Sequence, residues 1–336
     1  MKPRMLTSFG NTIVRRGDVV TKRSGDDPAR LLREAEWLRR LPAAVAGRFA
    51  RVLAVRAAGD RVEYDMPFYP GPSLLDRLVS SRFDLDAACA TLIDVCEFVD
   101  ATLHPVETAA RQPDLIDRIY AEKLRARMAQ VAGRASAFRA ICGAPMLMIN
   151  GRPCRQPLDS WDRMTQAVCR DTPRTARVHG DLKPDNILAD AEGFVLIDPR
   201  GGADDGRCDA DPLEDFAKLR TTTSAWYDVA RHGLIHLSVD GTAVNWRWQP
   251  AARQPIKRLR YADARLLTWL AERSKRHGDA LWRPRLDAIT GLLLAANAPV
   301  HLPPDGDLTA AGEALALYLY CEGALRLQQT MEAIGC

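Results

Sequence analysis

The sequence predicts an α+β protein with two lobes: a small, β-rich N-terminal lobe with one helix, and a larger, mainly helical C-terminal lobe. Three observations support this fold class. Strand-like segments around a single helix fill about the first 70 residues, a proline-rich connector follows them, and helical periodicity dominates the rest. We place the boundary in the connector, so the N-terminal lobe comprises residues 1–68 and the C-terminal lobe residues 69–336.

Two β-hairpins are expected in the N-terminal lobe. They pair residues 11–15 with 19–23 and residues 51–57 with 61–66. Each pair of segments flanks a short turn that contains Gly17 or Gly59. Such a turn favours glycine, because glycine takes a positive φ angle without steric cost. The N-terminal lobe is therefore expected to be built around a sheet.

One helix and the connector complete this lobe. Asp27 and Pro28 start the helix, because an acidic side chain suits the positive end of a helix and proline suits its first turn. Residues 67–72 read Pro-Phe-Tyr-Pro-Gly-Pro, a run that can continue neither a strand nor a helix. We expect an ordered connector between the lobes here.

Helices dominate the C-terminal lobe. The expected helices cover residues 73–80, 85–103, 115–131, 160–170, 212–222 and about 308–333. Asp211 and Pro212 start the fifth of these, and Glu214 follows in the pattern of a capping box. The last helix is apolar on most of its circumference, which predicts burial. Two short strand-like segments, 187–189 and 194–197, interrupt the helical pattern.

The strongest chemical signal lies in residues 178–188, which read Val-His-Gly-Asp-Leu-Lys-Pro-Asp-Asn-Ile-Leu, and in Asp198 after the next hairpin. Phosphoryl transfer needs a carboxylate that accepts the proton of the attacking hydroxyl, and hard oxygen ligands for magnesium. Asp181 precedes Asn186 by five residues, so the carboxylate can face an acceptor while the amide oxygen faces a metal ion. These residues predict a site where a nucleotide and an alcohol meet.

At these residues the chain resembles the aminoglycoside phosphotransferase and choline kinase superfamily, whose catalytic loop reads H-G-D-x-x-x-x-N. A chance match to these four residues has a probability on the order of one in several hundred. The resemblance implies the protein-kinase-like fold, ATP and Mg²⁺ as cofactors, Asp181 as catalytic base, and Asn186 and Asp198 as magnesium ligands. Lys183 is placed to touch the transferred phosphate, and His179 is expected to be structural.

The resemblance also assigns nucleotide-binding residues in the N-terminal lobe. Kinase-like folds use a strand lysine that contacts the α and β phosphates and is held by a helix glutamate. Lys22 matches this lysine, and Glu34 is preferred over Glu36 as its partner, because leucines follow Glu34 at plus four and plus seven. Gly10 lies in the turn 7–11 that would cover the phosphates.

Two further segments match the superfamily. Met66 and Phe68 lie where its connector binds adenine through backbone groups, although an ordinary proline-rich linker explains the residues as well. Asp215 begins a segment similar to D-L-A-K-L, whose aspartate braces the catalytic loop. A surface carboxylate is the alternative for Asp215.

Composition and charge limit the partners. The 47 basic and 43 acidic residues leave a net charge of +4, and no recognition motif accompanies the basic stretch 253–285, so we expect no nucleic-acid partner. No apolar run has the length of a signal peptide or a membrane helix, which predicts a cytoplasmic protein without a membrane partner. The eight cysteines form no CxxC pair and are expected to be reduced. The sequence does not indicate an oligomeric state.

The expected acceptor is a small molecule with a hydroxyl group, such as a sugar, a nucleoside or a related natural product. Ten lysines and arginines between residues 253 and 285 lie in the lobe that builds the superfamily's acceptor site, and they would repel a polycation. An aminoglycoside stays the alternative acceptor, because four acidic residues follow the metal loop: Asp204, Asp205, Asp209 and Asp211.

A protein kinase and a nucleotide-binding pseudokinase are less favoured. The chain has no A-P-E segment, and Gly180 stands where protein kinases usually carry arginine. All the expected catalytic and metal-binding residue types are present, which argues against a pseudokinase. Asp198-Pro199-Arg200 replaces the D-F-G of protein kinases, and Arg200 is a candidate to contact phosphate or substrate.

Overall fold

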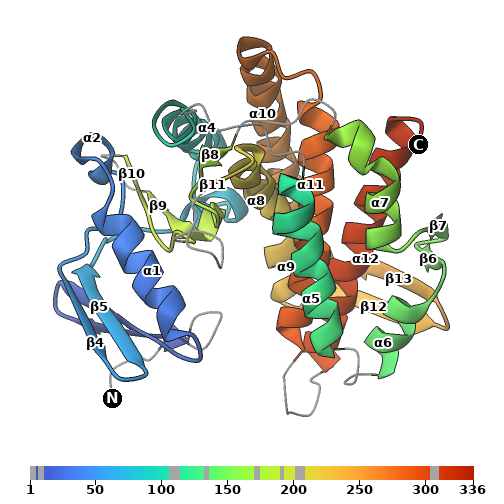
Figure 1. Ribbon diagram of the computed structural model, residues 1–336, viewed down its shortest axis with the longest axis horizontal. Coiled ribbons are helices and arrows are strands. Elements are labelled where there is room, and N and C mark those ends of the chain that lie inside the picture. Colours follow the sequence, from blue (N-terminus) through green and yellow to red (C-terminus); the bar gives the residue numbers. More distant parts are fainter. Residues whose placement is uncertain are drawn as a thin grey trace. The chain divides into compact units, whose positions relative to one another are not determined.

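The computed structural model describes residues 5–6, 11–105, 114–131, 136–169, 175–189, 193–200, 209–302 and 310–336. These residues form two compact units (Figure 1). The first contains the described residues up to Arg77, Ser81–Pro105 and the described residues of 176–209. The second contains Leu78–Ser80 and the described residues of 106–175 and 210–336. The lobe limits 1–68 and 69–336 stay a prediction.

A five-stranded antiparallel sheet forms the start of the first unit. Its strands are β1 (Met5–Leu6), β2 (Thr12–Arg16), β3 (Val19–Arg23), β4 (Ala54–Ala58) and β5 (Arg61–Pro67). They are arranged in the order β1-β2-β3-β5-β4. Both expected hairpins are confirmed, and β4 begins at Ala54, three residues later than expected. In β5 the residues alternate in burial, so Val62, Tyr64 and Met66 point to the core.

Helix α1 (Pro28–Arg39) packs against this sheet, and α2 (Ala43–Ala46) follows it (Figure 1). The start of α1 is as expected: Asp27 Oδ1 accepts from the amide of Arg30 at 2.9 Å, and proline occupies the first turn. Leu31 and Ala35 on α1 pack into one core with Val20, Ala50, Val62, Tyr64 and Met66. Burial of this apolar face holds α1 on the sheet.

The segment around Asp181 belongs to the same unit. This unit also contains α3 (Leu74–Val79) up to Arg77, α4 (Leu85–Thr102), β8 (Ala176–Arg177), the 3₁₀ turn Pro184–Asn186, β9 (Ile187–Ala189), β10 (Phe194–Leu196) and Asp209 of β11 (Asp209–Ala210). The β9–β10 hairpin is joined to the N-terminal segment by backbone bonds. The amide of Leu196 donates to the Arg48 carbonyl at 2.8 Å, and the amide of Ala50 donates to the Leu196 carbonyl at 2.9 Å. Residues about 150 positions apart in sequence therefore share one unit.

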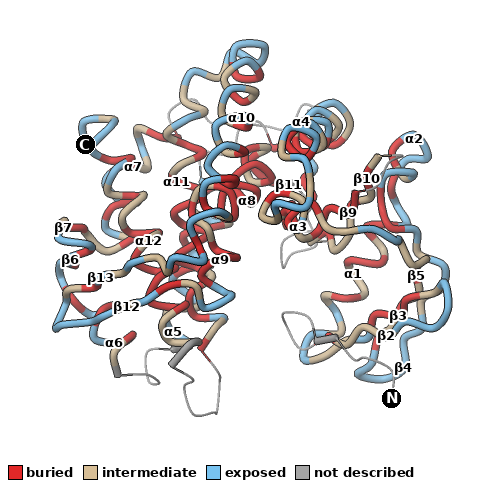
Figure 2. The backbone as a smooth tube through the Cα atoms, turned by 180° about the vertical axis from the view of Figure 1, so that it is seen from behind, coloured by how far each residue is buried: buried red, intermediate tan, exposed pale blue. Residues whose placement is uncertain are grey.

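The second unit is mainly helical. Its helices are the π-helical turn Asp117–Ala121, α5 (Glu122–Val131), α6 (Ser136–Gly143), α7 (Pro157–Val168), α8 (Leu213–Thr223), α9 (Tyr227–Arg231), α10 (Arg253–His277), α11 (Trp282–Asn297) and α12 (Ala310–Ala333), with 3₁₀ turns at Pro250–Ala252 and Ala298–His301. Helix α8 is almost wholly buried, and α11 is buried from Arg285 to Ala296 except at Asp287 (Figure 2). Where α11 and α12 cross, a Cβ at Gly323 would lie 2.6 Å from the Gly291 carbonyl oxygen, so this approach requires glycine. None of the described helices is both long and apolar enough to span a bilayer.

The start of α8 differs from the expected capping box. Asp211 Oδ1 accepts from the amide of Leu213 at 2.9 Å, as a cap does. The Glu214 side chain does not complete the box, because its Oε2 accepts from the Tyr120 hydroxyl at 2.8 Å. A tertiary contact has replaced the local one.

A four-stranded sheet in the second unit was not predicted. It contains β6 (Leu147–Ile149), β7 (Arg152–Cys154), β12 (Ile235–Asp240) and β13 (Ala243–Trp248) in the order β12-β13-β6-β7. Strands β13 and β6 pair in parallel, with Ala243 opposite Met148. The strands of three to six residues carry little periodicity, and the parallel pair joins distant parts of the chain. The sheet is therefore a product of tertiary pairing.

Candidate active site

The loop that contains Asp181 is held by its own backbone. Lys183 and Asn186 donate amide bonds to the carbonyls of Asp181 and Lys183, at 2.8 and 2.9 Å. The Asn186 Nδ2 donates to the Asp181 carbonyl at 2.8 Å. His179 is fully buried, its Nδ1 accepts from the Asp181 amide at 3.3 Å, and its ring lies near those of Trp37 and Phe49. Asp181 thus lies on a loop that is closed by its own hydrogen bonds, and His179 packs inside it against aromatic rings.

Asn186 and Asp198 are brought together by the β9–β10 hairpin. Leu196 lies opposite Ile187, and the amide of Ile197 donates to the Asn186 carbonyl at 3.0 Å. Asp198 follows directly, with a φ of 57°. The amide nitrogen of Asn186 is used by the loop, so the amide oxygen is the atom that would ligate a metal ion. An amide oxygen and a carboxylate on adjacent strand ends fit the hard oxygen donor set of Mg²⁺.

Lys22, Glu34 and Asp198 form one charged cluster. The Lys22 Nζ donates to the two carboxylate oxygens of Glu34 at 2.7 and 2.9 Å and to Asp198 Oδ1 at 3.0 Å. Burial alone would lower the pKa of Lys22, but Asp198 and Glu34 outweigh it and raise that pKa above its usual value. Burial raises the pKa of Glu34, while Lys22 acts against this rise. The contacts to both oxygens describe a closed ion pair, so Glu34, and not Glu36, meets Lys22.

Tyr64 belongs to this cluster, and the sequence analysis missed it. Its hydroxyl donates to Glu34 Oε1 at 2.5 Å, and the side chain is fully buried. Burial and the neighbouring Glu34 raise the pKa of the phenol, so it stays a donor. Tyr64 lies directly opposite Lys22 in the β3–β5 pair. The sequence did contain a signal for it. Val62, Tyr64 and Met66 alternate along the expected strand and so face the core together, and tyrosine is the only polar residue among the three.

Two cations approach the Asp181 carboxylate. The Arg200 Nη2 lies 3.4 Å from Asp181 Oδ2, and the Lys183 Nζ lies 3.8 Å from the same oxygen. Lys183 also lies 3.7 Å from Asp185 Oδ2. Asp181 is itself 7% exposed, so these contacts form in a largely dry environment. The structure therefore places Lys183 beside the predicted base and adds Arg200 to it.

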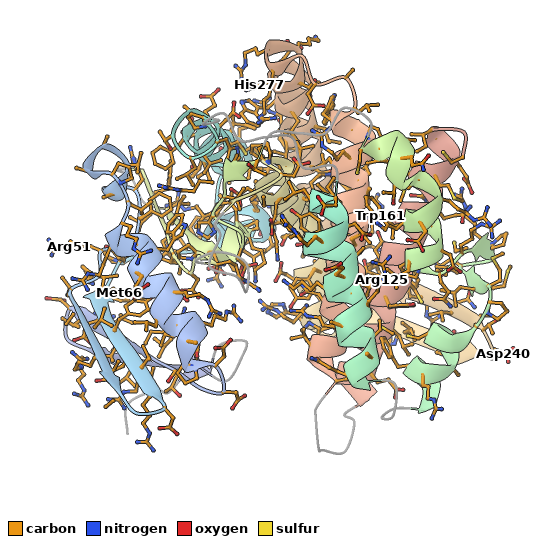
Figure 3. All side chains as sticks on the ribbon, in the orientation of Figure 1. Arg51, Met66, Arg125, Trp161, Asp240 and His277 are labelled. Carbon is orange, nitrogen blue, oxygen red and sulfur yellow. The ribbon has the colours of Figure 1, made fainter. Side chains whose placement is uncertain are left out.

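The remaining nucleotide-binding candidates have different surroundings. Gly10 lies outside the described residues. The side chain of Met66, which Figure 3 labels on the N-terminal sheet, is buried in the core of the first unit. The amide of Phe68 donates to the Asp18 carbonyl at 2.8 Å, and the Arg15 guanidinium lies 3.4 Å from the Phe68 ring centre. An adenine bound at this connector must therefore use backbone groups other than the Phe68 amide.

The basic stretch 253–285 is divided between the interior and the surface. Arg258, Arg273 and Arg285 are buried. Arg258 Nε donates to the Leu78 carbonyl at 2.8 Å, and Arg285 Nε donates to Asp211 Oδ2 at 2.7 Å. These guanidinium groups hold the second unit together. The seven others are exposed: Arg253, Lys257, Arg260, Arg265, Lys275, Arg276 and Arg283.

The acidic residues after the metal loop give little support to a cation site. Asp204 and Asp205, and the side chain of Asp209, lie outside what the structure describes. Asp211 is fully buried, and its two oxygens accept from the Leu213 amide and from Arg285. This carboxylate is already neutralised by the fold. On α8, Asp215 is also fully buried, and its role in bracing the catalytic loop stays a prediction.

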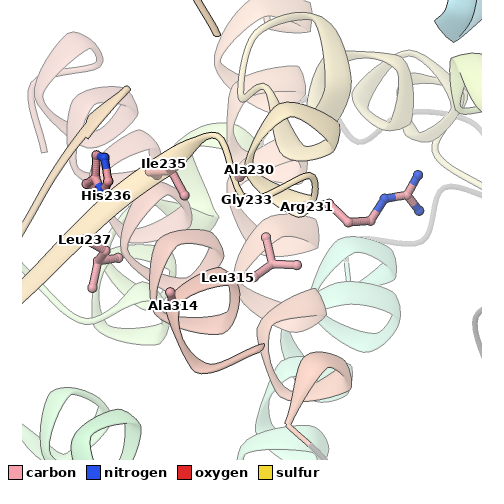
Figure 4. Close-up of a pocket in the computed structure, with 8 residues that line it drawn as sticks. All are labelled: Ala230, Arg231, Gly233, Ile235, His236, Leu237, Ala314 and Leu315. Carbon is pink, nitrogen blue, oxygen red and sulfur yellow. The ribbon is translucent and has the colours of Figure 1, made fainter. Parts of the chain in front are cut away.

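A cavity of about 290 Å³ lies in the second unit. It is lined by Ala230, Arg231, Gly233, Ile235, His236, Leu237, Ala314 and Leu315 (Figure 4). The Arg231 side chain extends away from the other lining residues, and its Nη2 pairs with Asp228 Oδ1 at 3.1 Å. Polar and apolar atoms both line this cavity, and none of the predicted site residues does.

The chain is similar to known phosphotransferases in sequence profile and in fold. The profile of the phosphotransferase enzyme family matches residues 6–248, more than half of the chain. No curated protein sequence matches this chain. The apo form of a thermostable mutant of aminoglycoside phosphotransferase APH(4)-Ia is 14% identical, with a TM-score of 0.51, covering 99% of this chain and 93% of that chain. The GDP complex of wild-type aminoglycoside 2'-phosphotransferase-IIIa is 12% identical, with the same TM-score and coverage. These structures confirm the predicted fold class.

Proposed function

Because this chain belongs to the phosphotransferase enzyme family, we propose that it is a kinase that transfers the γ-phosphoryl group of ATP to a hydroxyl group of a small acceptor. One observation carries the proposal. A closed Lys22–Glu34 pair, the metal-ligand candidate Asp198 and the loop of Asp181 meet within one compact unit. Closure of the lysine–glutamate pair is a requirement for activity in kinase-like folds.

Each residue has a separate task in this proposal. Lys22, held by Glu34, contacts the α and β phosphates. Asn186 and Asp198 would hold Mg²⁺, which when bound neutralises part of the triphosphate charge. Asp181 orients the acceptor hydroxyl and takes its proton while the hydroxyl oxygen bonds to the γ-phosphorus. The bond from that phosphorus to the bridging oxygen breaks, and ADP leaves with the electron pair.

The proposed acceptor is a neutral or anionic alcohol, such as a sugar, a nucleoside or a related natural product. Two groups of charged residues bear on whether a polycation could bind. Three of the ten cations in residues 253–285 are buried in structural contacts, so only the seven exposed ones would repel a polycation. The described acidic candidate, Asp211, is buried against Arg285 and offers no attraction. An aminoglycoside stays the alternative, because the two similar structures are aminoglycoside phosphotransferases in name.

A screen of acceptors tests the function and the acceptor class together. The purified protein is incubated with Mg-ATP, or with Mg-GTP in parallel, and with sugars, nucleosides, amino alcohols or aminoglycosides. Mass spectrometry then detects an added phosphate, and the Asp181→Asn variant serves as the control for contaminating kinases. We expect phosphorylation of a neutral or anionic alcohol. A kcat/KM near 10⁴ M⁻¹s⁻¹, the low end of common enzyme values, for kanamycin-like compounds alone would make the acceptor class wrong. Failure to bind or use either nucleotide would remove the kinase function itself.

A further inference from the structure

Arg200 is docked on the catalytic loop through its backbone. Its amide donates to the His179 carbonyl at 2.8 Å. Gly180, the next residue, has a φ of 75°, and a Cβ on it would lie 2.9 Å from the Arg200 Cβ. Real Cβ atoms do not approach so closely, so glycine at 180 is needed for Arg200 to lie against the loop. Where protein kinases usually carry an arginine next to the catalytic aspartate, this chain supplies one from residue 200.

The side chain of Arg200 ends at the predicted catalytic base. Its Nη2 is 3.4 Å from Asp181 Oδ2, and its side chain is 21% exposed. Lys183 approaches the same oxygen and also Asp185. These two cations and two carboxylates have no net formal charge. Lys183 is shared between the two carboxylates, whereas the Arg200 guanidinium brings a planar fork of five N–H donors beside Asp181.

Arg30 on α1 adds a third positive charge in the same region. Burial and repulsion from Arg200 lower the pKa of Arg30 to about 10, while Asp181 acts in the opposite direction. Arg30 is therefore influenced by Arg200 and Asp181, and also by Glu34 and Asp27. By contrast, Lys22, Glu34 and Asp198 together carry an excess negative charge, which suits a metal cation. The two cations that contact Asp181, Arg200 and Lys183, are instead the donors that an anionic phosphoryl group would need beside the base.

We propose that Arg200 is a catalytic residue that binds the oxygens of the γ-phosphoryl group while it passes from ATP to the acceptor. This inference rests on the proposed kinase function. In the transfer, the acceptor oxygen bonds to the γ-phosphorus, the bond to the bridging oxygen of ADP breaks, and the proton passes to Asp181. The transferred group is planar and anionic between the two oxygens, and the planar guanidinium fork matches its geometry. An arginine supplied in this way stabilises the transition state and leaves ground-state nucleotide binding nearly unchanged.

The test uses water as the acceptor, so that it does not depend on an identified alcohol. The Arg200→Met and Arg200→Lys variants are compared with the wild type in three measurements: the Kd for Mg-ATP, the rate of ATP hydrolysis at saturating Mg-ATP, and the tightening of Mg-ADP binding by aluminium fluoride. Aluminium fluoride imitates the planar phosphoryl group. We expect Arg200→Met to keep its Kd for Mg-ATP within about threefold and to lose at least about 100-fold in hydrolysis. It should also lose the tightening by aluminium fluoride. Arg200→Lys should give hydrolysis rates and aluminium fluoride tightening between those of the wild type and Arg200→Met, because lysine keeps the charge but lacks the planar guanidinium fork.

Arg23→Met is the matched control, since Arg23 lies in the same unit and its exposed side chain pairs with Glu63 at 2.8 Å. It should behave as the wild type in all three measurements. Near-normal hydrolysis and aluminium fluoride tightening in Arg200→Met would overturn the proposal. Arg200 would then either contact the acceptor or have a structural role only. If the wild type neither binds nor hydrolyses Mg-ATP, the kinase function fails and this proposal falls with it. If Arg200→Met does not fold, a normal Arg200→Lys variant overturns the proposal, and a selective loss of hydrolysis in that variant supports it.

Discussion

Replacing Tyr64 with phenylalanine tests whether the closed Lys22–Glu34 pair needs the second donor that the structure shows. The Tyr64 hydroxyl donates to Glu34 Oε1 at 2.5 Å, and Tyr64 is fully buried, so water cannot replace the lost bond without entering the core. A hydrogen bond to a charged group contributes about 1.5–3 kcal/mol to stability. If activity requires the closed pair, kcat/KM should fall by about 10- to 150-fold, since 1.36 kcal/mol corresponds to a tenfold change in rate.

The assay combines steady-state ATP turnover with thermal unfolding. Tyr120→Phe is the matched control, because the buried Tyr120 also donates its hydroxyl to a glutamate, the half-buried Glu214, at 2.8 Å, but in the second unit. Both variants should lose a similar amount of stability, and only Tyr64→Phe should lose kcat/KM. If Tyr64→Phe keeps kcat/KM within twofold of the wild type, or if Tyr120→Phe loses as much, the hydroxyl of Tyr64 does not hold the pair for catalysis.

Three other substitutions test single roles. Asp181→Asn should keep nucleotide affinity and lose at least about 100-fold in turnover, because general-base catalysis contributes about 10²- to 10⁴-fold; near-normal turnover would remove Asp181 as the base. Asp198→Ala should abolish magnesium-dependent nucleotide binding, and calorimetry that finds an unchanged affinity for Mg-ATP would contradict its role as a ligand. Burial alone would raise the pKa of Asp287, but Arg220 and Arg283 lower that pKa below its usual value. The charged Asp287 therefore stabilises the fold above about pH 3.9, and this stabilisation is lost as the pH falls through the folded pKa. Asp287→Asn should therefore lower the Tm by about 3–10 °C at pH 7, with a smaller difference below about pH 4; an equal difference at both pH values would exclude this electrostatic origin.

Much of the fold could be predicted because its signals are local. The start of α1 at Asp27 and Pro28 depends on residues within one turn, and the two N-terminal hairpins depend on short turns. The capping box expected at Asp211 did not form, because Glu214 accepts a hydrogen bond from the distant Tyr120 and not from the start of its own helix. The sheet of the second unit was missed for the same reason, because its parallel pair joins β6 and β13, whose residues are about 95 positions apart.

The candidate site shows the same division. The resemblance of the catalytic-loop and N-terminal segments to the superfamily was enough to select Asp181, Asn186, Asp198, Lys22 and Glu34 from the sequence. Their roles stay predictions, but the structure does bring them together within one compact unit.

Only the tertiary structure decided which other side chains contact these site residues. Tyr64 reaches Glu34 because β5 pairs with β3 in a register that sets Tyr64 opposite Lys22. Arg200 reaches Asp181 because Gly180 leaves room for it on the catalytic loop. Each of these contacts depends on strand register or on the close approach of distant segments. Sequence patterns report the neighbours of a residue along the chain, whereas register and packing bring together residues that the chain keeps far apart.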